Sequence, residues 1–185
     1  PLDMRMDGSS KQPFALTAKT LVNEYSEYEL SQIIRDYGEE RWARGIARSI
    51  VRNRPLDTTY QLVEAIRRGI PKGARYPKIH YATRTFQAIR IAVNDELGVL
   101  DASLSTAISS LTEGGRVVVI SFHSLEDRIV KWSFLQAAKE ERLRILTRKP
   151  IIPQESEISS NPASRSAKMR AAEKICATMM AENFI

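Results

Sequence analysis

The chain lacks the residues that stabilise or anchor several common protein classes. Its one cysteine, Cys176, cannot form an intramolecular disulfide, which excludes a disulfide-stabilised scaffold and suits a reducing compartment. With only two histidines, His80 and His123, we expect no structural zinc cluster and no metal. No apolar run approaches the roughly 20 residues that span a bilayer, and we expect neither a signal peptide nor a membrane partner. The 185 residues suit one domain or two small ones.

Positive charge is concentrated in one part of the chain. The whole sequence carries a net charge of +6, whereas residues 35–90 hold 13 Lys or Arg against five acids, a local excess of +8. Such an arginine-rich segment is typical of proteins that bind a polyanion, with nucleic acid the first candidate. The alternative is a solvated helical face, which charge alone does not exclude.

Helical periodicity dominates the first half. Helices are expected over residues 17–25, 26–37, 39–52 and 57–68. The second segment carries an apolar stripe and opens on a capping box in which Glu29 follows Ser26 by three positions. Residues 71–79 form a basic loop with two prolines, and helices are expected over 80–97 and 100–111. Trp42 and Phe86 lie at helical spacing, so we expect them in the core rather than stacked on bases.

The stretch 114–131 organises the second half. Residues 116–122 are apolar without polar alternation, which predicts a strand buried on both faces. His123, Ser124, Glu126 and Asp127 follow directly, and Ser124 with Asp127 fits a capping box. A strand that leads into a capped helix is half of a parallel βαβ unit, in which ligands bind beyond the carboxyl ends of the strands. The alternative is that these polar residues only cap the helix.

The remaining pattern is a short α/β segment. A helix is expected over 125–139, with Leu125, Ile129, Trp132 and Leu135 as its apolar stripe. A short strand is expected over 142–147 and a loop over 149–166. Periodicity does not decide between strand and helix for 168–176. So few strands are unusual for a complete parallel sheet.

Five segments together resemble a known family. They are PLDMRMD at residues 1–7, YGEERWARGIARSI at 37–50, HYATRTFQAIRIAVNDEL at 80–97, GGRVVVISFHSLEDRIVK at 114–131 and NPASRSAKMRAAEKI at 161–175. The chain resembles the bacterial and organellar 16S ribosomal RNA cytosine N4-methyltransferases, which use S-adenosylmethionine. It departs from them at Tyr81, where the family usually has proline, and at Ala163, where it usually has arginine.

The resemblance implies an α/β fold: part of a doubly wound, Rossmann-like methyltransferase sheet with a helical insert domain. It places residues 1–13 at a junction, 14–80 in the insert and 81–185 in the C-terminal part of the methyltransferase domain. It puts the S-adenosylmethionine site in a half that precedes PLDMRMD, so the chain is expected to be a C-terminal fragment that is inactive alone and has no cofactor-binding residues. None of the eight glycines form a G-x-G spacing, which agrees.

The same resemblance suggests site residues and partners. The residues expected to act on a cytosine amine are His123, Ser124, Glu126 and Asp127. Those expected to contact small-subunit ribosomal RNA, alone or in the ribosomal subunit, are Arg5, Arg41, Arg44, Arg48, Arg84 and Gln87. The structural alternatives are that Arg5 pairs with Asp3 or Asp7 and that Arg84 and Gln87 tie their helix to the sheet.

Two other functions compete with the methyltransferase: a basic helical module that binds nucleic acid without catalysis, and a structural or interaction protein. We expect a bacterial cytoplasmic location, with an organellar stroma or matrix as the alternative. A homodimer is left open.

Overall fold

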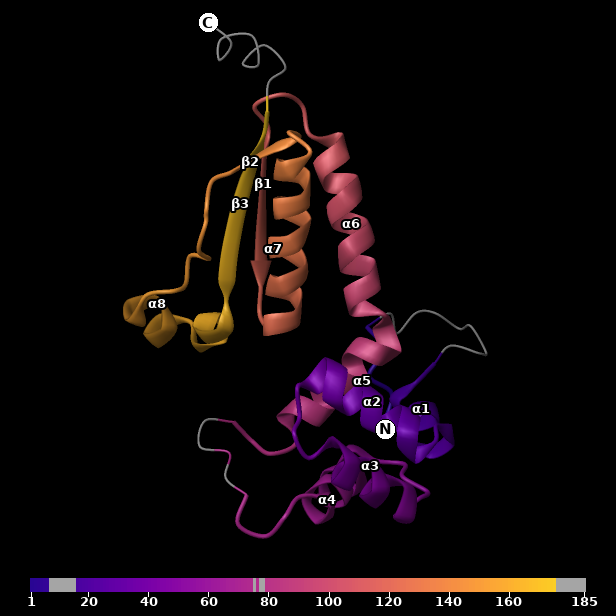
Figure 1. Ribbon diagram of the computed structural model, residues 1–185. Coiled ribbons are helices and arrows are strands. Elements are labelled where there is room, and N and C mark those ends of the chain that lie inside the picture. Colours follow the sequence, from indigo (N-terminus) through magenta and orange to yellow (C-terminus); the bar gives the residue numbers. More distant parts are fainter. Residues whose placement is uncertain (7–15, 75, 77–78, 176–185) are drawn as a thin grey trace, which may run out of the picture. The chain divides into compact units, whose positions relative to one another are not determined.

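The computed structural model describes residues 1–6, 16–74, 76 and 79–175, and the chain divides into two compact units (Figure 1). The first, here the helical unit, is Pro1–Glu96, and the second, here the α/β unit, begins at Leu97. The sequence suggested a boundary near residue 80. The helical unit extends further because the next helix packs within it.

Five helices make up the described part of the helical unit, and three of them, α1, α2 and α4, begin at a side-chain cap. They are α1 (Ala18–Glu24), α2 (Glu27–Gly38), α3 (Ala43–Arg52), α4 (Thr59–Gly69) and α5 (Thr83–Asn94). The predicted capping box at α2 is confirmed: the Glu29 N–H donates to Ser26 Oγ over 3.2 Å, and Glu29 Oε2 accepts from the Ser26 N–H over 2.8 Å. Helix α3 begins at Ala43 rather than at residue 39, because Glu39 adopts a left-handed conformation that ends α2.

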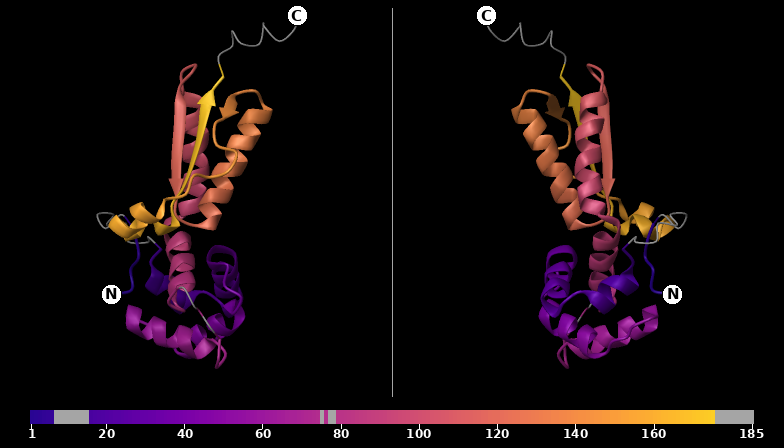
Figure 2. Two further views of the ribbon diagram at one scale, coloured as in Figure 1. Left: turned by 90° about the vertical axis from the view of Figure 1, so that its left-hand side faces the viewer. Right: turned by 90° about the vertical axis from the view of Figure 1, so that its right-hand side faces the viewer.

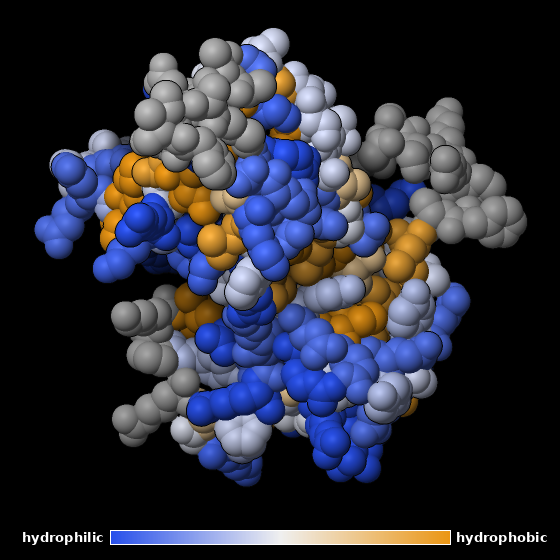
Figure 3. Space-filling view, turned by 45° about the horizontal axis from the view of Figure 1, so that its top comes forward, coloured by the Kyte–Doolittle hydropathy of each residue, from blue (hydrophilic) through white to orange (hydrophobic). Residues whose placement is uncertain are grey.

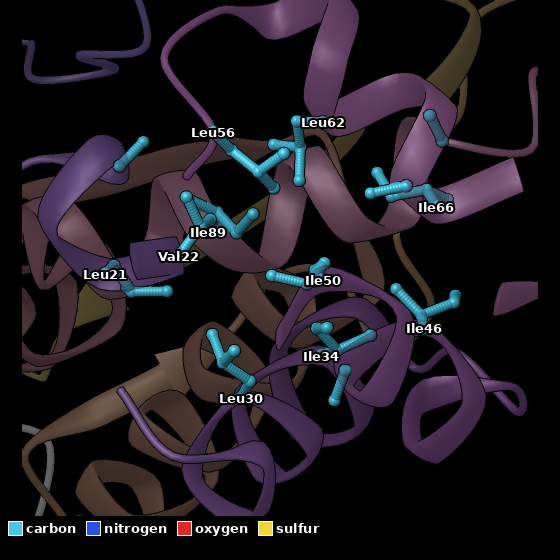
Figure 4. Close-up of a cluster of buried hydrophobic side chains, with 14 of the residues drawn as sticks. Leu21, Val22, Leu30, Ile34, Ile46, Ile50, Leu56, Leu62, Ile66 and Ile89 are labelled. Carbon is cyan, nitrogen blue, oxygen red and sulfur yellow. The ribbon is translucent and has the colours of Figure 1, made fainter. Parts of the chain in front are cut away.

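The core of the helical unit is aliphatic and draws on every helix (Figure 4). Trp42 and Phe86 are partly buried against this core, as the sequence predicted. Helices α3 and α4 approach so closely that a Cβ on Gly45 would lie 2.4 Å from the Gly69 carbonyl oxygen. The fully buried residues include Leu21, Leu30, Ile34, Ile46, Ile50, Leu62, Ile66 and Ile89.

The α/β unit is a three-stranded sheet with helices (Figures 1 and 2). Its elements are α6 (Glu96–Ser110, starting at the last residue of the helical unit), β1 (Arg116–Ser121), α7 (Ser124–Lys139), β2 (Leu143–Ile145), α8 (Glu155–Ser160), the 3-10 helix η1 (Pro162–Ser166) and β3 (Lys168–Lys174). The strand order is β1-β3-β2, and β3 pairs antiparallel with both neighbours. Strands β1 and β2 therefore run in the same direction and are joined by α7.

A buried cluster joins the helices to one face of the sheet. Leu104 and Ile108 of α6 pack with Val130 and Phe134 of α7, and Ala172 of β3 completes the centre of the cluster. The buried face of α7 follows residues 130, 134 and 137, so the predicted stripe was partly wrong: Trp132 is 61% exposed. The cause is the position of the sheet, which selects a different face of the helix from the one the aromatic and leucine spacing indicated.

Other expectations are corrected by the sheet. Strand β1 is not buried on both faces, because Val118 and Ile120 are more than half exposed at 55% and 56%. Hydrophobic patches are visible among the hydrophilic surface in Figure 3. The expected loop over 149–166 contains α8 and η1, and the undecided last segment is a strand as far as it is described. The doubly wound sheet itself remains a prediction. None of the described helices combines the length and apolarity needed to cross a membrane.

Candidate functional site

The end of β1 and the start of α7 bring together the four residues predicted to be catalytic, but their arrangement differs from the prediction. His123, not Ser124, is the N-cap residue of α7. Its Nδ1 accepts the Glu126 N–H over 3.3 Å, and Glu126 Oε2 accepts the N–H groups of Phe122 and His123 over 2.8 and 3.2 Å. The capping box is therefore one residue earlier than Ser124 and Asp127 suggested, and Ser124 is the first residue of the helix.

Asp127 is committed to an ion pair inside the α/β unit. The Arg170 guanidinium on β3 donates from Nε over 2.7 Å and from Nη2 over 3.2 Å to its two carboxylate oxygens. Lys168 Nζ lies 3.7 Å away. Hydrogen bonding from Arg170 is the main reason that the pKa of Asp127 is lowered. This bidentate pair ties α7 to β3 and makes Asp127 a poor proton acceptor, so the structure supports a structural role for it.

His123 and Glu126 each have a polar side-chain atom that the helix cap does not use. Because Nδ1 of His123 accepts a backbone N–H, a neutral ring carries its proton on Nε2. That Nε2 lies 3.4 Å from Glu126 Oε1, and the two side chains are 10% and 24% exposed. The carboxylate oxygen that does not accept the strand-end N–H groups thus faces an imidazole. An imidazole and a carboxylate in this arrangement can hold a polar group of a substrate by hydrogen bonds.

Three of the predicted RNA contacts lie on α3 or just before it. Arg44 and Arg48 are exposed on α3 and, four positions apart, lie on one side of the helix, and Arg41 is exposed in the turn that precedes it. Arg48 Nε lies 3.2 Å from Glu27, an exposed pair that contributes little to stability. The Arg41 guanidinium lies 5.0 Å from the centre of the Trp42 ring. The structure therefore presents these arginines at the surface of the helical unit.

Arg84 and Gln87 follow the structural alternative in a modified form. Arg84 Nη1 donates to the Glu39 carbonyl over 3.1 Å, and Gln87 Nε2 donates to the Tyr37 carbonyl over 3.2 Å. Both side chains satisfy carbonyl groups at the C-terminal end of α2, where cations also favour the helix dipole. They tie α5 to α2, within the helical unit, rather than to the sheet.

Arg5 also has an intramolecular partner. It donates from Nε and Nη2 to the two Asp3 oxygens over 2.7 and 2.8 Å, and hydrogen bonding from Arg5 lowers the pKa of Asp3 to about 2. Between them Met4 adopts a left-handed φ of 64°, with its carbonyl accepting from Asn94 Nδ2 over 2.9 Å. Strain of this kind often accompanies functional segments. The other candidate partner, Asp7, lies outside the described residues.

Two polar features were not found from the sequence. Arg170 sits in the middle of β3, where it is 7% exposed. Glu40 is 1% exposed, and its Oε1 accepts the Tyr76 hydroxyl over 3.1 Å and the Trp42 N–H over 3.0 Å. Burial and the neighbouring Glu40 carboxylate raise the pKa of Tyr76 to about 12. Arg170 is 43 positions from Asp127, and Tyr76 is 36 positions from Glu40. Because both pairs are so far apart in the sequence, no local pattern indicates them.

These observations define an α/β protein that combines a basic helical unit with a strand-end polar cluster. The chain belongs to the MraW methylase family, whose model matches residues 1–175. This confirms the resemblance to the 16S ribosomal RNA cytosine N4-methyltransferases seen in the sequence motifs.

Curated relatives agree with the family. The chain is 53% identical over 175 residues to a protein of Synechococcus elongatus and 55% identical over 177 residues to one of Kosmotoga olearia. It is 50% identical over 193 residues to one of Clostridioides difficile. Each is called ribosomal RNA small subunit methyltransferase H, and each match covers 95% of this chain. The matches cover 57%, 58% and 61% of those relatives, so the chain spans about three fifths of their length.

Proposed function

We propose that the chain takes part in S-adenosylmethionine-dependent N4-methylation of a cytosine in small-subunit ribosomal RNA. The observation that carries the proposal is the family match, together with relatives at 50–55% identity that are named as small-subunit ribosomal RNA methyltransferases. The chain would act as part of a longer enzyme, in the bacterial cytoplasm or in an organelle of bacterial origin, with ribosomal RNA or the small ribosomal subunit as its partner.

S-adenosylmethionine would supply an electrophilic methyl group on a sulfonium. The glycines show no G-x-G spacing, so we expect a part of the longer enzyme outside these 185 residues to bind it. This chain would therefore bind the nucleic acid, act at the target base and supply part of the methyltransferase sheet.

The exposed edge of β1 supports the proposal of a larger sheet. Within the described residues β1 pairs only with β3, and Val118 and Ile120 leave one of its faces apolar and uncovered. A parallel sheet needs helices on both faces, and mixed sheets that include an antiparallel strand such as β3 are common. Further parallel strands added at the free edge of β1 would complete a doubly wound sheet, with β3 and β2 at its margin.

His123 and Glu126 are proposed to act at the target base. Transfer to an exocyclic amine needs the base out of its stack, the nitrogen lone pair aligned with the methyl group, and an acceptor for the proton that leaves. The pair lies at the carboxyl end of a strand, where α/β sheets bind ligands, and presents an imidazole and a carboxylate 3.4 Å apart. Ser124 and Asp127 would support this pair by starting the helix and by anchoring it to β3.

The test uses the whole reading frame that contains these 185 residues. It would be expressed in a bacterium deleted for its own small-subunit methyltransferase H, and the nucleosides of purified 16S ribosomal RNA would be analysed by mass spectrometry. We expect N4-methylated cytidine to return. RNA that lacks this nucleoside despite soluble, folded protein would refute the proposal.

A second function is favoured by the charge distribution. The excess of +8 over residues 35–90 and the exposed arginines on α3 also suit a basic helical module that binds RNA without catalysis. The same experiment separates the two functions. Such a module would bind the ribosomal RNA in the deleted strain and leave its cytidines unmethylated.

A further inference from the structure

A cavity of about 420 Å³ opens in the helical unit. It is lined by the end of α4 and by the segment that leads to α5. Its volume falls in the range of roughly 300–1,000 Å³ typical of small-ligand sites. It contains none of the residues predicted from the sequence to contact RNA. The lining residues include Arg67, Ile70, Lys72, Tyr76, His80 and Tyr81.

Two neighbouring rings, tilted relative to each other, form one part of the cavity. The centroids of His80 and Tyr81 are 4.1 Å apart, with 32° between the ring planes. Tyr81 is partly buried against the hydrophobic core, whereas His80 is exposed. His80 Nδ1 accepts the Ala82 N–H over 3.2 Å, so a neutral ring carries its proton on Nε2. The imidazole is thus held by a packed neighbour and a backbone hydrogen bond, and it offers a flat surface and a donor.

Cations form another part of the lining. Arg67 and Lys72 are both exposed. Arg67 Nη2 lies 3.3 Å from Glu64, a long and solvent-exposed contact that a stronger anion can displace. No acidic side chain is among the described residues that line the cavity. A flat ring beside two cations matches the two parts of a nucleotide, its base and its phosphate.

A buried carboxylate anchors the side of the cavity that carries Tyr76. The Tyr76 hydroxyl donates to Glu40 over 3.1 Å, and Glu40 is 1% exposed. Because the pKa of Tyr76 is raised to about 12 by burial and by the nearby carboxylate, the hydroxyl keeps its proton at any physiological pH. This contact ties Tyr76 to the turn between α2 and α3. The side of the cavity that carries Tyr76 is therefore held by a contact within the protein.

We propose that this cavity binds one unpaired nucleotide of single-stranded RNA, with the base stacked on His80 and a phosphate between Arg67 and Lys72. The inference rests on the proposed RNA-directed function and adds a binding position separate from the arginines of α3 and from the strand-end cluster. Stacking on a ring does not select a base, so the cavity would hold the RNA strand in place rather than read its sequence.

The test measures RNA affinity of the whole chain by fluorescence anisotropy. The probes are a ten-nucleotide single-stranded RNA and the same oligonucleotide without bases. His80→Asn keeps an acceptor for the Ala82 N–H and removes the ring, whereas His80→Phe keeps a ring. We expect His80→Asn to bind the intact RNA at least about fivefold more weakly, with no loss on the base-free strand. His80→Phe should bind both as the original chain does.

Lys72→Gln should weaken binding to both strands by the same factor, because it removes a phosphate contact. Lys139→Gln on α7 loses the same charge at an exposed position outside the cavity and serves as the matched control. Free cytidine monophosphate is a separate probe, which shows whether the cavity binds a free nucleotide or a nucleotide within an RNA strand. It should compete only at concentrations far above those of the RNA.

Three results would overturn the assignment. Unchanged affinity of His80→Asn for intact RNA would refute the stacking site while leaving RNA binding by the chain intact. Free nucleotide that binds as tightly as RNA would make the cavity a small-molecule site. A chain that binds neither strand would contradict RNA binding in the proposed function itself, and the cavity proposal would fall with it.

Discussion

The single residue whose role changed most is Asp127. The sequence placed it in a capping box and among candidate catalytic groups, whereas the structure pairs it with Arg170 on β3 at side-chain exposures of 14% and 8%. A carboxylate in such a bidentate pair is poorly basic. The proposed role at the target base therefore rests on His123 and Glu126.

Asp127→Asn should destabilise the α/β unit by about 2 kcal/mol at neutral pH, because a charged hydrogen-bond pair is lost and Arg170 is left without its counter-ion. The folded-state pKa of Asp127 is lowered, so the pair contributes in full above the unfolded value of about 4. That contribution is lost as the pH falls through the folded value. Urea unfolding of both proteins at several pH values tests this.

The matched control is Asp36→Asn, in which the exposed Arg35–Asp36 pair at 3.2 Å is broken. It should change stability by less than about 0.5 kcal/mol. A difference between Asp127→Asn and the original chain that stays constant below pH 4 would contradict the assigned ion pair.

One substitution can separate the helix-capping role of His123 from its proposed catalytic role. Asparagine is an effective N-cap residue, so His123→Asn should keep α7 capped and leave the melting temperature nearly unchanged. In the full-length enzyme it should lower single-turnover methylation at least about 100-fold, the usual scale for loss of a positioned acid or base. Full methylation by His123→Asn and by Glu126→Gln would reduce the pair to a helix cap.

At the scale of elements, helices were predictable and their environment was not. The capping box of α2 and the core positions of Trp42 and Phe86 follow from spacings of three and four residues. The sheet depends on distant pairing: Arg116 lies opposite Glu173, and β3 is central although KMRAAEK has little strand character. Local periodicity does not indicate which distant segments pair. The sequence therefore predicted neither the exposed face of β1 nor the Arg170–Asp127 ion pair.

Close packing of α3 on α4 gives a prediction at this scale. Gly45→Ala would place its Cβ 2.4 Å from the Gly69 carbonyl oxygen, so the helices must separate. We expect a loss of about 1–3 kcal/mol, the cost of inserting a methyl group into a tightly packed contact. Gly98→Ala at an exposed position of α6 is the control; it should be neutral or stabilise by up to about 1 kcal/mol. Equal thermal stability of the two variants would be inconsistent with the described crossing.

At the scale of the whole molecule, the charge distribution and the architecture both indicate that the two units have different partners. The local excess of +8 lies in the helical unit, and the α/β unit presents an apolar strand edge without a described partner. One unit suits a polyanion and the other suits further protein. A chain that spans about three fifths of its relatives' length fits this division of roles.

RNA binding by the helical unit should be dominated by phosphate contacts. Each neutralised phosphate releases condensed counterion, so the logarithm of the association constant should fall linearly with the logarithm of salt concentration, by about 0.7 per contact on a single strand. Replacing Arg41, Arg44 and Arg48 together by glutamine should make that slope shallower by about 2, because each arginine that contacts a phosphate contributes about 0.7. Titrations of one RNA at four salt concentrations give both slopes.

A charge-matched control separates this surface from net charge. Arg144, Arg148 and Arg165 of the α/β unit are exposed, and their joint replacement by glutamine removes the same three charges. It should lower affinity slightly at low salt, through the weaker long-range field, while leaving the slope unchanged. If both triple variants reduced the slope equally, RNA would be held by overall charge, and Arg41, Arg44 and Arg48 would lose their assignment as its contact surface.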